Sequence, residues 1–380
     1  MGGKYIEFYG KNCISPVRQD ISDLARHFER REGLYRQLGI FPLSVEGKSI
    51  LEIGPGSGYN SIYTASLSPS LYHLVEENPT GIREMEELFE QYSKWTYNTE
   101  IFKTRIEDFN NSIKYDIVLC EGMLPQITNS IEILNIIKQF VKPGGILVIT
   151  CIDSISGASE NLRYLIGNLM VWELDDINKM LDILVPVFSP HLETLKGMSR
   201  RHDDWVMDNI INPLGVAETL SIAKTVEELS DEFEAYASSP GIFCDWRWYK
   251  SICGETKSFN QTAVNQYWCQ VHNLLDYRSL YPPREESQNK KMYFLFEQLR
   301  KNIKELVDHR DIALLKQITI DIKEIINSLE SISHELALPF IEALDILLQD
   351  KIYPAQVINS KNFKSFFGRG QQYLSLIRNL

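Results

Sequence analysis

Short apolar runs alternate with helix-like segments across residues 49–151, and this alternation limits the possible folds more than any other feature. The runs cover residues 49–53, 71–75, 100–104, 115–120 and 146–151. Each has the length of a buried strand, and turn residues bound most of them. Strands that alternate with helices favour a parallel sheet with helices on both faces and right-handed crossovers. We therefore predict an α/β fold with a doubly wound, mostly parallel sheet.

The composition is that of an ordinary globular protein. The chain has 380 residues, of which 44% are hydrophobic and 24% charged, enough for about two domains. The formal net charge is −12, whereas proteins that bind nucleic acids usually carry a positively charged surface. The charge therefore argues against nucleic acid as a partner. No apolar run reaches the roughly 18 residues that span a bilayer, and the first residues carry no secretory h-region. We expect a cytoplasmic protein without a membrane partner.

The pattern changes along the chain, and we predict five segments from it. They are an N-terminal helical cover (1–44, with one or two helices over 17–39), a ligand-binding core (45–154), a helical insertion that forms a lid (155–223), a return to the core sheet (224–280) and a helical C-terminal domain (284–380). Pro186 and Pro190 are expected to end the first long helix of the insertion.

Two segments carry more specific predictions. Residues 225–237 have a helical period, and the aromatic segment 241–249 is the expected sixth strand. In the C-terminal domain we expect helices over about 287–307, 312–331 and 335–349, and a further helix at the end. Their apolar stripes indicate either a core or a subunit seam, so a homodimer through these helices is possible.

The six cysteines show no CxxC pair and no zinc-ligand spacing. Cys120 and Cys151 end apolar runs, where cysteine usually serves as a small hydrophobic residue. We expect neither a disulfide framework nor a metal site.

A glycine-rich turn follows the first strand, with glycines at positions 54, 56 and 58. Such glycines let the backbone approach a ligand closely, at the sheet edge where α/β proteins bind ligands. A dinucleotide fingerprint fails because Tyr59 stands where its third glycine belongs, and the turn lacks the lysine of a phosphate loop. Glu76 ends the second strand, at the distance expected of a ribose-binding carboxylate. The pattern favours a nucleoside cofactor without phosphates.

Four motifs in order carry a resemblance to a known family. They are LEIGPGSG (51–58), LVEENP (74–79), YDIVLCEGML (115–124) and FVKPGGILVIT (140–150). Together they resemble the cofactor-binding core of the class I S-adenosylmethionine-dependent methyltransferases, over about residues 45–152. The resemblance implies a Rossmann-like sheet and S-adenosylmethionine as cofactor.

The resemblance also implies a role for individual residues. Those expected at the cofactor are Glu52, Gly54 and Gly56 at its methionine end, Gly58 at the helix start, Glu76 at the ribose, Ile106 and Glu107 near the adenine, Glu121 and Gly122 below the sulfonium, and Tyr59 closing over it. Arg105 departs from the family, which often has an acidic residue there.

The sequence gives weaker evidence for the residues that bind and activate the methyl acceptor. In the segment from Arg200 to Trp205, His202 is the candidate general base, with Asp203 and Asp204 as carboxylates that could orient it. The alternative is a solvated polar loop that Trp205 anchors to the protein. A metal at this His-Asp-Asp sequence is disfavoured because neighbouring Asp side chains diverge.

We expect Trp205, Asp245, Arg247 and Tyr249 to contact the substrate. If 241–249 is a strand, Asp245, Arg247 and Tyr249 share one face, suited to a sugar or an anionic group, although they would equally suit a packed core.

The sequence therefore predicts a methyltransferase that acts on an O or N atom of a small or carrier-linked metabolite. The loop after the fourth strand lacks the Asn/Asp-Pro-Pro-aromatic motif of enzymes that methylate exocyclic base amines. The alternatives are a protein or tRNA methyltransferase, and a cofactor-binding scaffold without catalytic activity.

Overall fold

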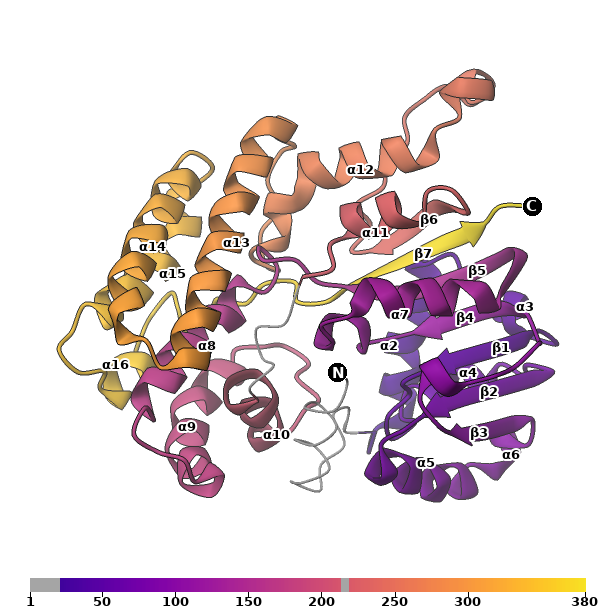
Figure 1. Ribbon diagram of the computed structural model, residues 1–380, viewed down its shortest axis with the longest axis horizontal. Coiled ribbons are helices and arrows are strands. Elements are labelled where there is room, and N and C mark those ends of the chain that lie inside the picture. The colour runs from indigo at the N-terminus through magenta and orange to yellow at the C-terminus, as the bar shows by residue number, and fades with distance from the viewer. Residues whose placement is uncertain (1–20, 213–218) are drawn as a thin grey trace. The chain divides into compact units, whose positions relative to one another are not determined.

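A seven-stranded sheet organises the chain in the computed structural model, which describes residues 21–212 and 219–380 (Figure 1). The strand order is β3-β2-β1-β4-β5-β7-β6. The strands are β1 (Ser49–Ile53), β2 (Leu71–Glu76), β3 (Thr99–Lys103), β4 (Tyr115–Cys120), β5 (Val141–Cys151), β6 (Phe233–Ser239) and β7 (Gln372–Arg378). Strands β1 to β5 pair in parallel, whereas β7 pairs antiparallel with both β5 and β6. The prediction of a mostly parallel, Rossmann-like sheet is confirmed.

The chain divides into two compact units, and the sheet belongs to the first. This unit comprises Met1–Ile152, Ala217–Tyr267 and Gln371–Leu380. Its helices are α2 (Leu24–Gln37), α3 (Pro42–Val45), α4 (Ser61–Ser66), α5 (Pro79–Gln91), α6 (Ser93–Thr96), α7 (Ser130–Ile137), α11 (Ile222–Leu229) and most of α12 (Phe259–Gln270). The central strands are buried on both faces, as their unbroken apolar runs require. Cys120 and Cys151 are buried at the strand ends, like small hydrophobic residues.

The second unit comprises Asp153–Val216 and Trp268–Gly370, so the expected insertion and most of the expected C-terminal domain cluster together. Its helices are α8 (Ala158–Met170), α9 (Ile177–Leu192), α10 (His202–Val206), α13 (Glu286–His309), α14 (Leu315–Glu330), α15 (His334–Leu347) and α16 (Pro354–Ile358). The apolar stripe of α14 packs inside this unit, with Ile318, Ile322, Ile325 and Leu329 fully buried.

Two predicted helices of the chain have different bounds in the structure. Pro186 and Pro190 lie inside α9 and do not end it; their spacing of four residues places both on one side of the helix. The predicted N-terminal helix is α2, which begins at Leu24, and the residues before position 21 lie outside the described part of the chain, as do 213–218 of the expected lid.

The predicted sixth strand at 241–249 is wrong. The sixth strand is β6, and it comes from the end of the segment that we predicted as a helix, since α11 stops at Leu229. Apolar residues at 226, 229 and 233 continue a helical period, but β6 is an edge strand whose pairing with β7 overrides that local pattern. Residues 241–248 are irregular, and Trp246 and Trp248 are exposed.

The prediction that the chain ends in a helix is also wrong. Residues 372–378 form β7, which is inserted between β5 and β6. Its partners in β5 lie more than 200 positions earlier in the sequence, so no local pattern could reveal the pairing.

Within the described residues, no helix is long and apolar enough to cross a membrane.

Candidate cofactor-binding site

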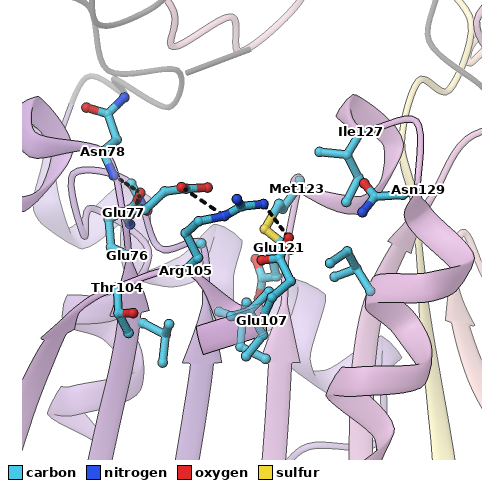
Figure 2. Close-up of a pocket in the computed structure, with 17 residues that line it drawn as sticks. Glu76, Glu77, Asn78, Thr104, Arg105, Glu107, Glu121, Met123, Ile127 and Asn129 are labelled. Atoms are coloured by element: carbon cyan, nitrogen blue, oxygen red, sulfur yellow. Dashed lines mark hydrogen bonds and ion pairs between the residues drawn. The ribbon is translucent and has the colours of Figure 1, made fainter. Parts of the chain in front are cut away.

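A pocket opens at the carboxyl ends of the parallel strands of the first unit (Figure 2). The lining residues are Ile53, Gly54, Gly56, Val75, Glu76, Glu77, Asn78, Thr104, Arg105, Ile106, Glu107, Glu121, Gly122, Met123, Ile127, Asn129 and Ile133. Four of them are glutamates and one is an arginine, so the lining is rich in negative charge.

The glycines of the turn after β1 have separate roles. Gly54, Gly56 and Gly58 all have positive φ angles, of 68°, 58° and 74°, which favour glycine. A Cβ on Gly54 would lie 3.3 Å from the Met123 side chain, at the pocket wall. A Cβ on Gly58 would lie 2.7 Å from the Met85 side chain. Gly54 and Gly56 therefore line the pocket, whereas Gly58 allows close packing against α5.

Glu76 joins two backbone segments at the pocket. Its Oε2 accepts a hydrogen bond of 2.8 Å from the Gly56 amide, and its Oε1 accepts bonds of 2.9 and 2.8 Å from the amides of Glu77 and Asn78. Burial raises the pKa of the carboxyl, and these three amides partly offset the rise. Each carboxylate oxygen has two lone pairs, so Oε1 is fully used and Oε2 keeps one position that can accept a bond from a ligand hydroxyl.

Helix α5 holds the glycine turn from the other side. The Asn78 side chain caps the helix by accepting bonds from the amides of Thr80 and Gly81. Ser57 donates a hydrogen bond of 2.6 Å to Glu84. The start of α5 is therefore fixed against the turn, which keeps the turn backbone in one conformation.

A buried ion pair lies at the β4 side of the site. Arg31 of α2 donates two hydrogen bonds of 2.7 Å, one to each oxygen of Glu121. Both side chains are almost completely buried, at 7% and 6% exposure. Gly122 follows Glu121, and its amide donates a bond of 2.8 Å to the Thr150 hydroxyl of β5. The pair thus ties the helical cover to the loop that follows β4.

Glu52 is buried near the same charges. Burial and the negative charge of Glu121 raise the pKa of Glu52 to about 7, although the Tyr72 hydroxyl donates a hydrogen bond to its carboxylate. Glu52 is not among the pocket-lining residues, and neither is Tyr59, whose carbonyl accepts a bond of 2.9 Å from His27.

A smaller charge cluster lines the β3 side. Figure 2 shows Arg105 between Glu77 and Glu107. Arg105 forms ion pairs with both carboxylates, and its Nε lies 3.6 Å from Glu77. Ile106 lies buried beside them and lines the pocket. Arg105 thus engages two of the four pocket glutamates.

The residues predicted to be catalytic lie in the second unit. The His202 ring nitrogen Nδ1 lies 3.0 Å from the hydroxyl of Ser189 on α9. Asp203 instead pairs with Arg201 at 2.6 Å, which helps hold the pKa of Asp203 low. The ring is therefore oriented by Ser189, and the expectation that Asp203 orients it is wrong. Asp204 is half-buried on the same helix, and Trp205 is buried, as an anchor of this segment would be.

The predicted substrate-contacting residues 245, 247 and 249 lie in the loop between β6 and α12. Asp245 and Arg247 pair at 2.6 Å, and Arg247 also donates bonds to the carbonyls of Thr256 and Lys257. Tyr249 is 69% exposed. These contacts all lie within the loop. Because the segment is not a strand, the three residues do not share a strand face.

Sequence reasoning missed several residues at the site. Asn78, Arg105, Met123, Ile127, Asn129 and Ile133 line the pocket, and Arg31 pairs with Glu121. Asn78 could have been found from its position before Pro79 at a helix start. Among the described residues, no group of three or more His, Cys, Asp or Glu side chains could hold a metal ion.

Comparison with known proteins identifies the domain that contains the pocket. A family model described as "Methyltransferase domain" matches residues 26–191. Two curated relatives are similar over shorter stretches. The ribosomal RNA small subunit methyltransferase G of Campylobacter jejuni subsp. doylei is 28% identical over 94 residues, and protein arginine N-methyltransferase 6 of Danio rerio is 22% identical over 147 residues. These matches cover 25% and 38% of this chain, and 48% and 40% of the relatives, so the chain spans about half of their length or less.

A solved structure is similar over a larger part of the chain. PKMT2 from Rickettsia typhi, in complex with AdoHcy, is 14% identical, with a TM-score of 0.43 over 62% of this chain and 49% of that one. The family match covers the four motifs and the parallel strands β1 to β5, whose carboxyl ends form the pocket. Residues 26–191 therefore contain a methyltransferase domain of the class I, S-adenosylmethionine-dependent type.

Proposed function

We propose that the protein is an S-adenosylmethionine-dependent methyltransferase that binds its cofactor in the pocket of the first unit. The observation that carries this proposal is the composition of the pocket lining. It includes seven of the residues predicted at the cofactor: Gly54, Gly56, Glu76, Ile106, Glu107, Glu121 and Gly122. Glu76 ends β2 and the others follow β1, β3 and β4, so these residues come from separate parts of the sequence and meet only at the sheet edge.

The charge of the pocket supports this cofactor over a phosphate-bearing nucleotide. Four glutamates and one arginine line it, so the lining stays negative even after Arg105 pairs with Glu77 and Glu107 and Arg31 pairs with Glu121. Such a lining repels a pyrophosphate and attracts a cationic sulfonium and its ammonium group. The positive-φ glycines leave the backbone open on that side, as a cofactor lying against it requires.

The chain's own residues would bind and align the reactants. When bound, S-adenosylmethionine supplies a methyl group on a sulfonium whose sulfur leaves as a neutral thioether. Glu76 would accept a bond from a ribose hydroxyl through the free position of its Oε2 while its amide partners hold it in place, and Ile106 would contact the adenine. Binding in one fixed orientation and exclusion of water provide most of the catalysis in such an in-line transfer.

The acceptor is proposed to be an O or N atom of a small or carrier-linked metabolite. His202 is the candidate general base, and Trp205, Asp245, Arg247 and Tyr249 are the candidate substrate contacts. The helical insertion, residues 155–223, would act as the lid. RNA and protein acceptors are the alternative, which the names of the two curated relatives favour. We also propose a cytoplasmic location and a homodimer through the C-terminal helices, for which light scattering in solution is the test.

Calorimetry and turnover assays test the proposal in two steps. We expect S-adenosylmethionine and S-adenosylhomocysteine to bind in the micromolar range, and NAD and ATP not to compete. Methyl transfer from radiolabelled cofactor would then be measured on metabolite, carrier-protein, peptide and tRNA panels. Transfer to the first two classes supports the proposed substrate, and transfer to peptides or tRNA selects the alternative. Cofactor binding without turnover on any panel would favour the scaffold.

A further inference from the structure

The loop between β6 and α12 exposes three aromatic rings to solvent. The side chains of Trp246, Trp248 and Tyr249 are 91%, 65% and 69% exposed. Figure 1 shows this part of the chain extending beyond both β6 and α12. Exposed apolar side chains that stand together usually mark a contact with a partner, whereas scattered single ones are ordinary. The rings therefore indicate a contact surface, and we call residues 241–258 the aromatic loop.

The aromatic loop is held in shape by its own hydrogen bonds. Arg247 donates bonds of 2.6 to 3.0 Å to both oxygens of Asp245. It also donates to the carbonyls of Thr256 and Lys257. Two backbone bonds close a short helical turn across residues 248–252. A braced loop loses little conformational freedom when its rings are buried, and satisfied backbone groups lower the cost of leaving water.

The charges of the aromatic loop nearly cancel. It contains three basic and two acidic residues, so nucleic acid, which requires a clear excess of positive charge, fits it poorly. The Lys250 ammonium lies 5.8 Å from the ring centroids of both Trp248 and Tyr249. Such a cation can reach a phosphate group while the rings beside it enter an apolar layer. The loop thus matches the level of a bilayer where lipid phosphates border the acyl chains.

The rings lie toward the end of the sheet opposite the pocket. Strand β6 runs parallel to β5, because both pair antiparallel with β7. Phe233 therefore begins β6 at the amino ends of the parallel strands, whereas the pocket lies at their carboxyl ends. Asn260 donates a bond of 2.7 Å to the Phe233 carbonyl, and Lys257 pairs with Glu234 at 2.8 Å. Arg247, between the two exposed tryptophans in sequence, contacts the carbonyl of Lys257. A surface bound by the rings therefore need not cover the pocket.

A lipid surface suits this loop better than a protein partner does. A stable protein interface takes about 20–30 residues from each side, whereas these rings come from four consecutive positions of one loop. A lipid surface needs no complementary shape, and Trp and Tyr are the residues enriched at the membrane–water interface. The expectation of no membrane partner rested on the lack of a spanning segment, which a surface contact does not require.

We propose that the aromatic loop attaches the protein to the surface of phospholipid membranes. Trp246, Trp248 and Tyr249 enter the interface, and Lys250 meets the phosphate groups. Because ring burial drives this contact, it should form on zwitterionic phosphatidylcholine and change little with salt concentration. The inference depends neither on the pocket nor on the proposed methyl transfer, since it concerns a different part of the first unit.

Sedimentation with phosphatidylcholine vesicles tests the proposal on the full chain. The wild type is compared with Trp246→Ala/Trp248→Ala at low and high salt. Loss of both rings should weaken vesicle binding at least tenfold, since burying one large apolar side chain changes a partition constant by roughly tenfold or more. Phe41→Ala/Tyr97→Ala is the matched control, because these rings are 56% and 68% exposed elsewhere in the first unit. This control should bind vesicles as the wild type does.

Thermal melts check that both double variants fold. Trp246→Ala alone should weaken vesicle binding severalfold, and a side chain so exposed can be removed without loss of the fold. A wild type that does not bind vesicles, or a tryptophan variant that binds as well as the wild type, overturns the proposal. Equal losses in both double variants do the same. Binding that requires phosphatidylserine and disappears at high salt also contradicts it, because charge then drives the contact. Self-association that only the tryptophan variant abolishes, without vesicle binding, would identify a protein interface instead.

Discussion

Gly81 of α5 lies directly against Gly56 of the glycine turn: a Cβ on Gly81 would come 3.1 Å from both the carbonyl carbon and the oxygen of Gly56. Both atoms belong to the backbone, which cannot rotate away as a flexible side chain can. Gly56 also donates its amide to Glu76 and lines the pocket. The first turn of α5 therefore sets the position of the backbone against which the cofactor is proposed to lie.

Replacing Gly81 should displace this backbone. We expect Gly81→Val to weaken binding of S-adenosylhomocysteine by about tenfold, because a β-branched side chain forces the turn away from α5. Gly33→Ala is the matched control, since Gly33 is also helical and a Cβ there meets no atom within 4 Å. That control should raise stability by roughly 0.5–1 kcal/mol and leave affinity unchanged. Calorimetry and thermal melts measure both; unaltered affinity of Gly81→Val would show that the turn adapts.

Glu76→Gln should impair both folding stability and cofactor binding. Both carboxylate oxygens of Glu76 accept hydrogen bonds from backbone N–H groups. The side-chain NH2 group of a glutamine would replace one of these oxygens and would therefore face at least one N–H donor. We expect a loss of about 1–3 kcal/mol in stability and a 10- to 100-fold weaker affinity for S-adenosylhomocysteine.

Glu77→Gln serves for comparison, because it removes the same charge from the next residue and keeps those amide bonds. Its effect on stability should be much smaller. If the Glu76 and Glu77 variants behave alike in melts and in calorimetry, net charge and not the amide contacts governs the site.

Glu52 should make stability depend on pH. Its pKa is raised from an ordinary 4.5 to about 7 by burial, so the folded state holds a proton that the unfolded state releases. The stability from this proton is complete below about pH 4.5 and is lost as the pH rises to 7. Glutamine at this position is neutral at every pH, so the Glu52→Gln variant does not lose this stability. Its free energy of unfolding, relative to that of the wild type, should therefore rise by ~1–3 kcal/mol from pH 4.5 to 7 and then level off. Denaturant titrations at several pH values test this, and curves that stay parallel would rule it out.

His202 should affect turnover without affecting cofactor affinity. If it is the base, His202→Ala lowers turnover about 100-fold or more. Ser189→Ala should cause a smaller loss, because it frees the ring that Ser189 contacts. Asp203→Asn should have little effect, since Asp203 pairs with Arg201. If His202→Ala keeps full activity, His202 is not the general base, and the segment around it has only a structural role.

The sequence by itself determined the five parallel strands, the glycine turn and the acidic residue after β2. Each depends on a local pattern: unbroken apolar runs indicate buried strands, and alternating glycines indicate a turn that a ligand can approach. The order of the motifs was enough to predict a pocket with Gly54, Gly56, Glu76 and Glu121 in its lining.

Only the tertiary structure decided the remaining parts. Strand β7 takes its place between β5 and β6 through pairing with residues far away in sequence, and no local pattern encodes such a pairing. The same holds for Arg31 and Glu121, which are 90 positions apart. An arginine on an amphipathic helix ordinarily faces solvent, and it becomes buried here because the fold brings a carboxylate to it.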